Sequence, residues 1–518
     1  MKISRLKKIR VVVSLLFFTI ITLLFVDFSG NSSGIFGNGF VAIQFIPSFI
    51  KYLAVGGIFS AGFILIIMLT VLSGRVYCST ICPLGILQDI FSRLSFRKKR
   101  KRKFKNSKPH NILRYSILGV SVVTFLSGSI FGLTLLDPYS NYGRIASNIF
   151  RPLVIFSNNI IASLFEVFEN YSVFPVDFKG IEPVALIFSL TLFTIVFVLS
   201  IKKGRIFCNT ICPVGTLLGL ISKVSVFKIA IDENACKSCG LCEKVCKSGC
   251  IDSKSKEIDF SRCVSCFNCF ESCPTDGLKY SYKYRFGKNE QKDDESKRDF
   301  LKKTAVYLIG LSFISKAQEK IKVYSQNKIV PDRKLPVSPP GSKSIEEFND
   351  KCTACHLCVS ACPTQVLQPS FLEYGFTGML QPRMDNFKGF CNFECNLCGE
   401  ICPNGAILPL KLEEKKLTQI GKAIFIRDNC VVITQGTDCG ACSEHCPTKA
   451  VHMVPEKNLL VPEVNDKICI GCGACEFACP TKPYKAIYVN GSAEHILAEK
   501  PDTGNEKKKV DLKEEFPF

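Results

Sequence analysis

Residues 236–246 read CKSCGLCEKVC, and residues 263–274 read CVSCFNCFESCP. Both stretches contain the spacing Cys-x2-Cys-x2-Cys-x3-Cys, and the second continues into a proline. Thiolates are soft ligands, and this close spacing lets one tight loop deliver three sulfurs to an iron–sulfur cubane while the fourth crosses to a neighbouring cubane. We therefore predict two [4Fe–4S] sites here. Zinc is the less favoured alternative, because both runs are complete and keep the same rhythm.

The crossing of the fourth cysteine fixes the expected ligand sets. One set is Cys236, Cys239, Cys242 and Cys273, and the other is Cys263, Cys266, Cys269 and Cys246. Cys250 is a ninth cysteine, which we interpret as a packing residue. The spacing is that of bacterial ferredoxins, so residues 229–283 are predicted to form an α+β ferredoxin-type domain.

Four further groups of cysteines occupy residues 351–485. Two groups keep the regular spacing, and two have a longer first interval, as a loop insertion would produce. Both tandem and nested exchange of the fourth cysteine fit the sequence. We predict four more clusters, six in all, with the ligands Cys352, Cys355, Cys358, Cys362, Cys391, Cys395, Cys398, Cys402, Cys430, Cys439, Cys442, Cys446, Cys469, Cys472, Cys475 and Cys479.

The composition agrees with metal ligation and a membrane surface. The chain has 29 cysteines in 518 residues and a formal net charge of +21. A disulfide framework has no reason to repeat a ferredoxin spacing. The densest basic block, Arg97–Lys103, lies between apolar runs, which favours a membrane surface over nucleic acid as its partner.

The first 228 residues are predicted to be a membrane domain. Residues 11–26, 52–74, 115–136 and 183–201 lack charge over about the thickness of a bilayer. The distribution of Lys and Arg places both ends of this unit in the cytoplasm. The shorter segment 152–165 is expected to lie along the outer face. The expected fold is a four-span helical bundle built from two duplicated helix pairs.

The duplication is clearest in two phrases, GRVYCSTICPLG at 74–85 and GRIFCNTICPVG at 204–215. Their Cys-x3-Cys-Pro motifs, at 78–83 and 208–213, follow apolar runs and are expected at the inner face. Cys78, Cys82, Cys208 and Cys212 form a candidate additional metal site, with a redox-active dithiol and structural thiols as the alternatives. Arg75 and Arg205 are interpreted as anchors at the membrane boundary that could also tune the thiolates.

The remaining segments connect or end these domains. Residues 284–350 are predicted to be a linker, in which residues 296–317 resemble a twin-arginine export signal retained as an anchor. Residues 486–518 are expected to be a disordered tail. His356 and His445 are interpreted as solvated loop residues, and His110 as a residue near the inner membrane face.

Together, these motifs resemble NapH-type membrane iron–sulfur proteins, which are related to the membrane halves of NosR and CcoG-type proteins. The resemblance is carried by Pro83, Pro213 and the cysteines of the paired motifs and the first ferredoxin domain. The four-cluster block resembles NapG, which usually accompanies NapH as a separate chain. The resemblance implies a bacterial inner-membrane protein that oxidises menaquinol or another quinol. It would deliver electrons to a periplasmic reductase or cytochrome partner, with residues 229–283 cytoplasmic and 351–485 periplasmic.

Two alternatives belong to other functional classes. A CcoG-like protein would assist assembly or maturation, or reduce a metal. A membrane-tethered exchanger would keep every cluster in the cytoplasm and serve soluble partners. The sequence identifies neither the donor nor the terminal acceptor.

Overall fold

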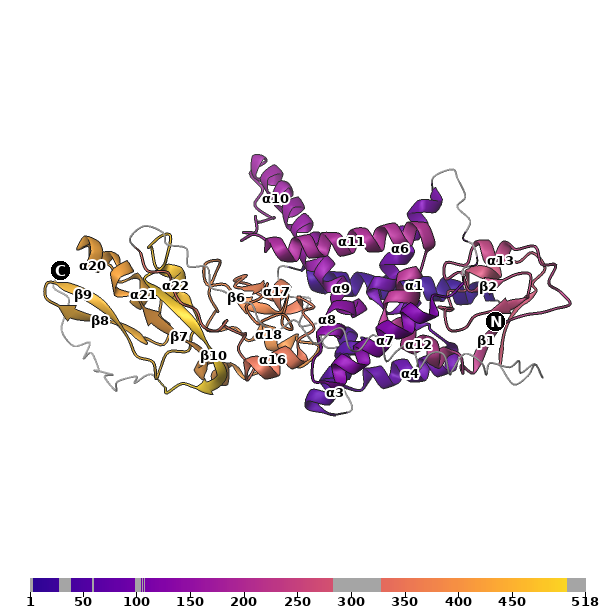
Figure 1. The fold of residues 1–518 in the computed structure, drawn as a ribbon. Coiled ribbons are helices and arrows are strands. Elements are labelled where there is room, and N and C mark those ends of the chain that lie inside the picture. Colours follow the sequence, from indigo (N-terminus) through magenta and orange to yellow (C-terminus); the bar gives the residue numbers. More distant parts are fainter. Residues whose placement is uncertain are drawn as a thin grey trace, which may run out of the picture.

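The computed structural model describes residues 3–27, 39–57, 60–97, 104, 106, 108–282 and 328–500. These residues form three parts that follow one another along one long axis (Figure 1). A two-site module (227–282) lies at one end, a helical unit (3–222) in the middle and a four-site block (328–500) at the other end. The twin-arginine-like segment 296–317 lies outside the described residues.

The helical unit consists of helices of very different length. Their bounds are α1 Ile3–Val26, α3 Phe45–Val55, α4 Gly62–Ser73, α5 Tyr77–Thr80, α6 Pro83–Arg97, α7 Asn111–Leu126, α8 Phe131–Leu136, α9 Pro138–Ile145, α10 Arg151–Val167, α11 Pro183–Lys203 and α12 Pro213–Ser222, with π-helical turns η2 Ala146–Phe150 and η3 Phe207–Ile211.

Three helices among the described residues are long and apolar enough to cross a membrane: Arg5–Val26, Pro138–Val167 and Pro183–Lys203. The first and third contain the predicted spans 11–26 and 183–201. The other two predicted spans are not single helices. Residues 52–74 are divided between α3 and α4, and residues 115–136 between α7 and α8.

Glycines explain both interruptions. Gly56 and Gly57, after α3, have φ of 68° and 89°, and Gly128, after α7, has φ of 87°. Glycine adopts this left-handed region without the steric penalty of a Cβ, so it ends a helix readily. The spans 52–74 and 115–136 were predicted from their continuous apolar character alone, and the glycines that end the helices within them were overlooked.

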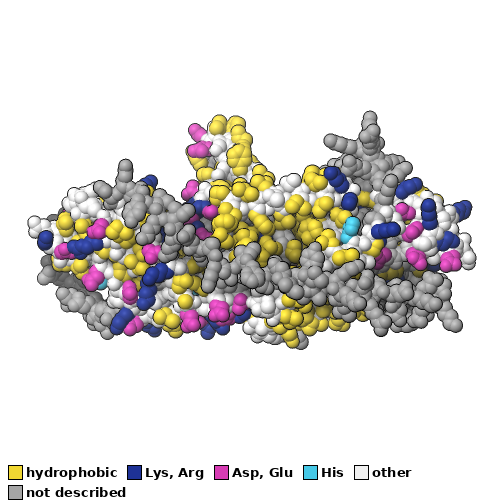
Figure 2. Space-filling model, viewed as in Figure 1, with side chains coloured by type: hydrophobic (Ala, Val, Ile, Leu, Met, Phe, Trp, Pro, Cys, Tyr) yellow, Lys and Arg dark blue, Asp and Glu magenta, His cyan; other side chains and the backbone are white. Residues whose placement is uncertain are grey.

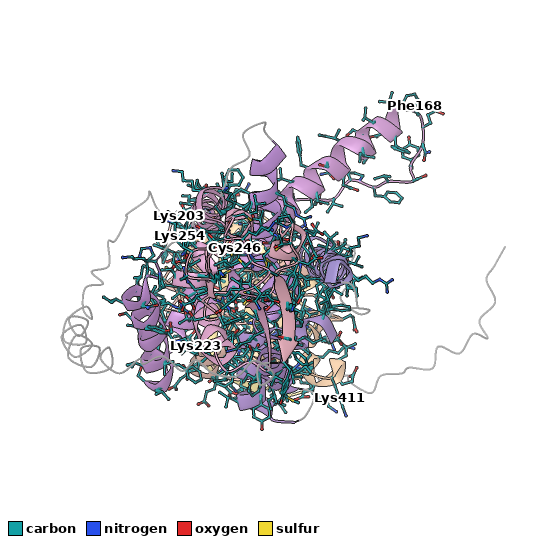
Figure 3. All side chains as sticks on the ribbon, turned by 90° about the vertical axis from the view of Figure 1, so that its right-hand side faces the viewer. Phe168, Lys203, Lys223, Cys246, Lys254 and Lys411 are labelled. Carbon is teal, nitrogen blue, oxygen red and sulfur yellow. The ribbon has the colours of Figure 1, made fainter. Side chains whose placement is uncertain are left out.

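The segment 152–165 belongs to α10, which continues from α9 and η2. In Figure 1, α10 projects sideways from the long axis, near the end of the helical unit that adjoins the four-site block. Phe168 marks the tip of this projection in Figure 3. Figure 2 shows a largely hydrophobic surface on it.

The two-site module has two small antiparallel sheets. Strand β1 (Phe227–Ile231) pairs with β4 (Leu278–Tyr282), and β2 (Ile251–Asp252) pairs with β3 (Glu257–Ile258). Short helices α13 (Leu241–Lys244) and α14 (Asn268–Glu271) carry the cysteine runs.

The four-site block repeats this scheme with more elements. Strand β5 pairs with β6, β8 with β9, and β7 with β10, all antiparallel. The bounds are α16 Ile345–Lys351, α17 Leu357–Ala361, β5 Leu367–Pro369, β6 Pro382–Met384, α18 Leu397–Glu400, α19 Leu412–Leu417, β7 Thr418–Phe425, η5 Arg427–Asn429, α20 Val431–Gln435, α21 Ala441–Glu444, β8 Val451–Glu456, β9 Leu459–Val464, α22 Ala474–Ala478 and β10 Ile487–Leu497.

Strand β10 corrects the expected domain boundary at residue 485. It pairs with β7 from Ile487 opposite Phe425 to Leu497 opposite Thr418. Residues 486–500 are therefore part of the block, and only residues 501–518 of the expected tail lie outside the described chain. The start of the block also precedes 351, because residues 328–350 are ordered against it.

One hydrophobic core connects the three parts. It includes Phe25, Tyr77 and Leu84 of the helical unit, Val264 of the two-site module and Leu357 of the four-site block. The helical unit and the four-site block also meet through polar contacts. Ser147 Oγ of the helical unit lies 2.7 Å from Ser360 Oγ of the four-site block. The parts are thus packed against each other rather than merely tethered.

Candidate metal centres

The two-site module brings together all four cysteines of one predicted ligand set and three of the other. We call Cys236, Cys239, Cys242 and Cys273 site 1, in which Cys242 interacts electrostatically with Cys236 and Cys273. Site 2 contains Cys263, Cys266, Cys269 and Cys246, which line one cavity. The loops turn sharply at Ser238 and Ser265, whose φ values are 51° and 49°. These turns direct successive sulfurs toward a common centre.

Cys250 lies among the site 2 cysteines rather than in a separate packing position. It lines the same cavity. Its Sγ is 3.5 Å from Sγ of Cys246. This distance places a thiol where it can donate a hydrogen bond to a ligand sulfur. Sequence spacing alone gave no reason to expect this contact.

The four-site block resolves the pairing that the sequence left open, because its groups exchange their fourth cysteine in tandem. Site 4 is defined by Cys352, Cys355, Cys358 and Cys402, and site 5 by Cys391, Cys395, Cys398 and Cys362. Site 6 gathers Cys469, Cys472, Cys475 and Cys446, and site 7 gathers Cys430, Cys439, Cys442 and Cys479. Cys430 is therefore beside its group despite its long interval in sequence.

The four cysteines of the Cys-x3-Cys-Pro motifs meet inside the helical unit, and we call this group site 3. All four are buried, and each pair among them interacts electrostatically. Cys78 lies in α5 and Cys208 in η3, whereas Cys82 and Cys212 directly precede the prolines that begin α6 and α12. The motif is thus a helical turn followed by the start of a second helix.

Matching hydrogen bonds join the two Cys-x3-Cys-Pro motifs at site 3. The Arg75 guanidinium donates to the Cys208 carbonyl oxygen at 3.3 Å, and the Arg205 guanidinium donates to the Cys78 carbonyl oxygen at 2.6 Å. Each arginine precedes one motif by three residues and bonds the other motif. Both side chains are buried, at 0% and 1% exposure, so the interpretation of them as membrane-boundary anchors was wrong.

Additional polar groups reach the site 3 sulfurs. Arg75 Nη2 lies 3.8 Å from Cys78 Sγ, Gln88 Nε2 donates to Cys208 Sγ at 3.2 Å, and the Gly215 amide donates to Cys212 Sγ at 3.3 Å. Hydrogen bonds to sulfur stabilise negative charge there. The arrangement suits deprotonated, ligating thiolates.

Buried charge near site 3 is unbalanced toward cations. Asp89 accepts hydrogen bonds from Arg205 at 2.9 Å and from Arg10 at 3.2 Å, and it forms an ion pair with Lys247 at 3.3 Å. Arg75 is also buried nearby and donates to Asn209 Oδ1 at 2.9 Å, and among the described residues no carboxylate forms an ion pair with it. Buried charges are costly unless they are compensated. A thiolate-ligated iron–sulfur cluster, which carries net negative charge, would supply the missing compensation.

A buried polar series leads from site 3 toward site 4. The Tyr77 hydroxyl donates to Gln44 Oε1 at 3.1 Å and interacts electrostatically with both Cys82 and Asp137. Tyr139, two residues after Asp137, interacts in turn with Cys355 of site 4. All of these side chains are buried. The helical unit is therefore not an inert apolar spacer between the two sites.

The helical unit contacts the backbone at site 4 directly. Gly143 of α9 approaches the Cys355 carbonyl oxygen so closely that a Cβ there would lie 2.3 Å from it. Arg144 Nε donates to the Ala354 carbonyl oxygen at 3.1 Å. His356 contacts Asn148 at 3.3 Å and the Leu380 carbonyl oxygen at 2.9 Å.

The histidines differ from one another. His356 is 1% exposed, so the prediction that it is a solvated loop residue was wrong. Burial and the positive charge of Arg144 lower the pKa of His356 to about 3, which keeps its ring neutral. His445 is exposed, as expected, and His110 is an exposed residue preceding α7.

The residues fit iron–sulfur clusters better than single metal ions. A tetrahedral zinc site would bring its sulfurs to within about 3.8 Å of one another. Within the described ranges, no group of three or more His, Cys, Asp or Glu side chains is arranged to hold one metal ion. Four cysteines instead line each of the cavities at sites 4, 5 and 7, and five line the cavity at site 2.

Comparison with protein families agrees with this chemistry. Residues 55–104 and 185–231, which contain both Cys-x3-Cys-Pro motifs, match a 4Fe–4S binding domain. Residues 345–368 match another 4Fe–4S binding domain, and residues 435–483 match a 4Fe–4S dicluster domain.

Among the similar proteins are a ferredoxin-type protein and a putative electron transport protein. The chain is 28% identical to an uncharacterized protein of Methanocaldococcus jannaschii over 48% of this chain and 81% of the relative. It is 32% identical to the methylamine utilization ferredoxin-type protein MauM of Methylophilus methylotrophus, over 26% of this chain and 61% of MauM. The putative electron transport protein YccM of Escherichia coli is 24% identical over 40% of this chain and 51% of YccM.

No solved structure matches the chain. The domain matches and the relatives, taken with the seven cysteine groups, identify a ferredoxin-type iron–sulfur protein with an electron-transfer role.

Proposed function

We propose that this chain is a membrane-bound relay that accepts electrons from a quinol and passes them to a reductase or cytochrome at the far end of the four-site block. The observation that carries the proposal is the linear order of the cysteine sites. In the three parts of Figure 1, sites 1 and 2 precede the bundle, site 3 lies within it, and sites 4 to 7 follow it. Iron–sulfur clusters supply one-electron chemistry, while the protein sets their spacing and burial.

Contacts along the chain support this order. Helix α1 packs against α14 beside site 2, against α5 at site 3 and against α17 at site 4. Lys7 of α1 pairs with Glu271 of α14, and Phe25 of α1 adjoins Gly143 at site 4. At 1.5 Å per residue, these two positions on α1 are about 27 Å apart. Site 3 divides this distance, which supports its role as a stepping stone.

The order within the four-site block follows from further contacts. Cys358 of site 4 interacts electrostatically with Cys398 of site 5. The Cys391 amide of site 5 donates to the Cys472 carbonyl oxygen of site 6 at 2.9 Å. Sites 6 and 7 exchange their fourth cysteines, so site 7 ends the series. An electron acceptor would therefore dock near α20 and α21.

We further propose an inner-membrane location with the two-site module in the cytoplasm and the four-site block in the periplasm. Of the three long apolar helices, Arg5–Val26 and Pro183–Lys203 run along the axis between these parts, whereas α10 of the third projects sideways. Lys202 and Lys203 end α11 at the side of the two-site module, as the positive-inside tendency expects of a cytoplasmic face. The placement of the two parts at opposite ends weighs against an exchanger with all clusters on one side.

The proposal assigns seven [4Fe–4S] clusters rather than six. The seventh is at site 3, where the buried cations and sulfur-directed donors favour an anionic group over neutral thiols. Seven clusters require about 28 iron atoms per chain and six about 24.

The experiment uses the full chain, purified without oxygen and held in lipid nanodiscs. A menaquinol analogue is added, and cluster reduction is followed by absorbance and electron paramagnetic resonance (EPR). The relay predicts reduction by the quinol and oxidation on addition of an acceptor. If dithionite reduces the clusters but the quinol never does, the quinol assignment is refuted.

A further inference from the structure

Ser261, in the loop that leads to site 2, is bonded by two buried arginines of the helical unit. Arg75 donates to the Ser261 carbonyl oxygen at 3.0 Å. Arg114 donates to the same oxygen at 3.2 Å and to Ser261 Oγ at 3.1 Å. Ser261 precedes the site 2 ligand Cys263 by two residues. The two-site module therefore docks on the helical unit through a loop that carries site 2 ligands.

A sequence difference after the two Cys-x3-Cys-Pro motifs explains this docking. Asp89 and Gly219 each lie seven residues after the second cysteine of their motif. Asp89 receives Arg205 at 2.9 Å. Gly219 has no side chain to do the same, and the Ser261 carbonyl oxygen lies in the space, because a Cβ at Gly219 would be 2.4 Å from that oxygen. A carbonyl of the two-site module thus receives Arg75 where a carboxylate receives Arg205.

The other ligand loop of site 2 contacts residues around the second motif. The Arg205 amide donates to the Lys247 carbonyl oxygen at 2.9 Å, and Asn209 Nδ2 donates to the Ser248 carbonyl oxygen at 3.5 Å. Lys247 and Ser248 directly follow the site 2 ligand Cys246. Both ligand loops of site 2 are therefore fixed by residues that also hold site 3.

The Arg75 guanidinium itself reaches site 3. Its Nη2 donates to the Cys208 carbonyl oxygen at 3.3 Å and lies 3.8 Å from Cys78 Sγ. Arg75 interacts electrostatically with Cys208 of site 3 and with Cys263 of site 2. No carboxylate of the described residues forms an ion pair with it, so one buried positive charge lies between the two sites. An electron added to a cluster at either site would be attracted to this charge.

We propose that Arg75 is a positioning residue that couples site 2 to site 3, because it holds the site 2 loop against site 3 and places one positive charge between the two clusters. One electron passes between the clusters, so that one is oxidised and the other reduced, with no bond formed or broken. This inference rests on the proposed function, since it takes both sites to hold clusters of the relay. It makes the two-site module a part of the electron route.

The test measures the reduction potentials of sites 2 and 3 in the full chain in nanodiscs. Titrations with dithionite and redox mediators are followed by EPR, and the two signals are assigned as those altered in Cys269→Ser and Cys208→Ser. Wild type is compared with Arg75→Gln, which removes the charge, and with Arg75→Lys, which keeps it. Arg114→Gln is the matched control, since Arg114 also bonds Ser261 but, among the described residues, bonds no site 3 sulfur.

We expect Arg75→Gln to lower the equilibrium constant for reduction of each site about tenfold, which is a downward shift of about 59 mV in each potential. Arg75→Lys should recover about half of that shift, and Arg114→Gln should change the constant for site 3 by less than about twofold. An unchanged potential at either site in Arg75→Gln, or an equal shift of site 3 in Arg114→Gln, would overturn the coupling.

Gly219→Ala tests the docking without removing the charge, and it decides the matter if Arg75→Gln fails to fold. Its Cβ would displace the Ser261 carbonyl oxygen but leave Arg75 at site 3, so the potential of site 2 alone should fall. Trypsin should also cleave faster after the exposed Lys223, which follows α12 at the junction with the module (Figure 3). Unchanged cleavage with an unchanged site 2 potential would refute the docking. Because these titrations use no quinol, a quinol that reduces nothing would refute the quinol donor alone.

Discussion

A substitution at Gly143 tests the contact between the helical unit and the four-site block. A Cβ at this position would lie 2.3 Å from the Cys355 carbonyl oxygen and 2.7 Å from the Phe25 ring. Ordinary contact begins near 3.4 Å, so Gly143→Ala requires a shift of about 1.1 Å in the Cys355 loop or in the helix. Overpacking of this kind costs about 1–3 kcal/mol. The block would be displaced from the bundle, and transfer from site 3 to site 4 would slow.

The matched control is Gly119→Ala, because Gly119 lies in helix α7 and a Cβ there meets nothing within 4 Å. Both variants should retain full iron and sulfide. After mixing with the menaquinol analogue, freeze-quench EPR should show slower reduction of the four-site block in Gly143→Ala than in Gly119→Ala. Limited proteolysis should also release the block more readily from Gly143→Ala. If the two variants behave alike in both assays, the close contact at Gly143 does not control the coupling.

Three further perturbations test other parts of the account. Asp89→Asn leaves three buried cations without their carboxylate and should lower the free energy of unfolding by about 3–5 kcal/mol. This loss should appear as a lower denaturation midpoint of the purified chain. An unchanged midpoint would contradict the argument that Asp89 compensates the buried cations. Cys250→Ala should keep full iron but lower the reduction potential of site 2, because a hydrogen bond to Cys246 sulfur is lost; a loss of iron would make Cys250 a ligand instead. Burial lowers the pKa of His495 to about 4, so the unfolded chain binds more protons below about pH 6.5 and stability should fall between pH 6.5 and 4. The variant His495→Gln should reduce this dependence in melting curves, and an identical dependence would refute the assignment.

The sequence was most informative where chemistry depends on local spacing. The Cys-x2-Cys-x2-Cys-x3-Cys rhythm was sufficient to predict ferredoxin-type iron–sulfur domains, which the domain matches confirm. It also predicted that Cys246 and Cys273 exchange sites, and the structure places them accordingly. These features arise within short loops, so no long-range packing has to be known.

Features that depend on distant packing were less accessible. The pairing within the four-site block requires knowledge of which groups are spatial neighbours, and only the fold supplies it. The burial of Arg75, Arg205 and His356 depends on contacts between segments more than 100 residues apart. The two interrupted spans were missed for another reason: apolar character was weighed above the glycines that end the helices. Strand β10 was missed because its pairing partner, β7, is distant in sequence.

The central claim is that electrons cross the bundle through the four cysteines of site 3. Its most direct test is freeze-quench EPR of wild type and Cys208→Ser, both in nanodiscs, after mixing with the menaquinol analogue. The account predicts that Cys208→Ser has about four fewer iron atoms per chain and no longer delivers electrons to sites 4 to 7, while dithionite still reduces those sites. Full iron content, with reduction of the four-site block at the wild-type rate, would contradict the claim.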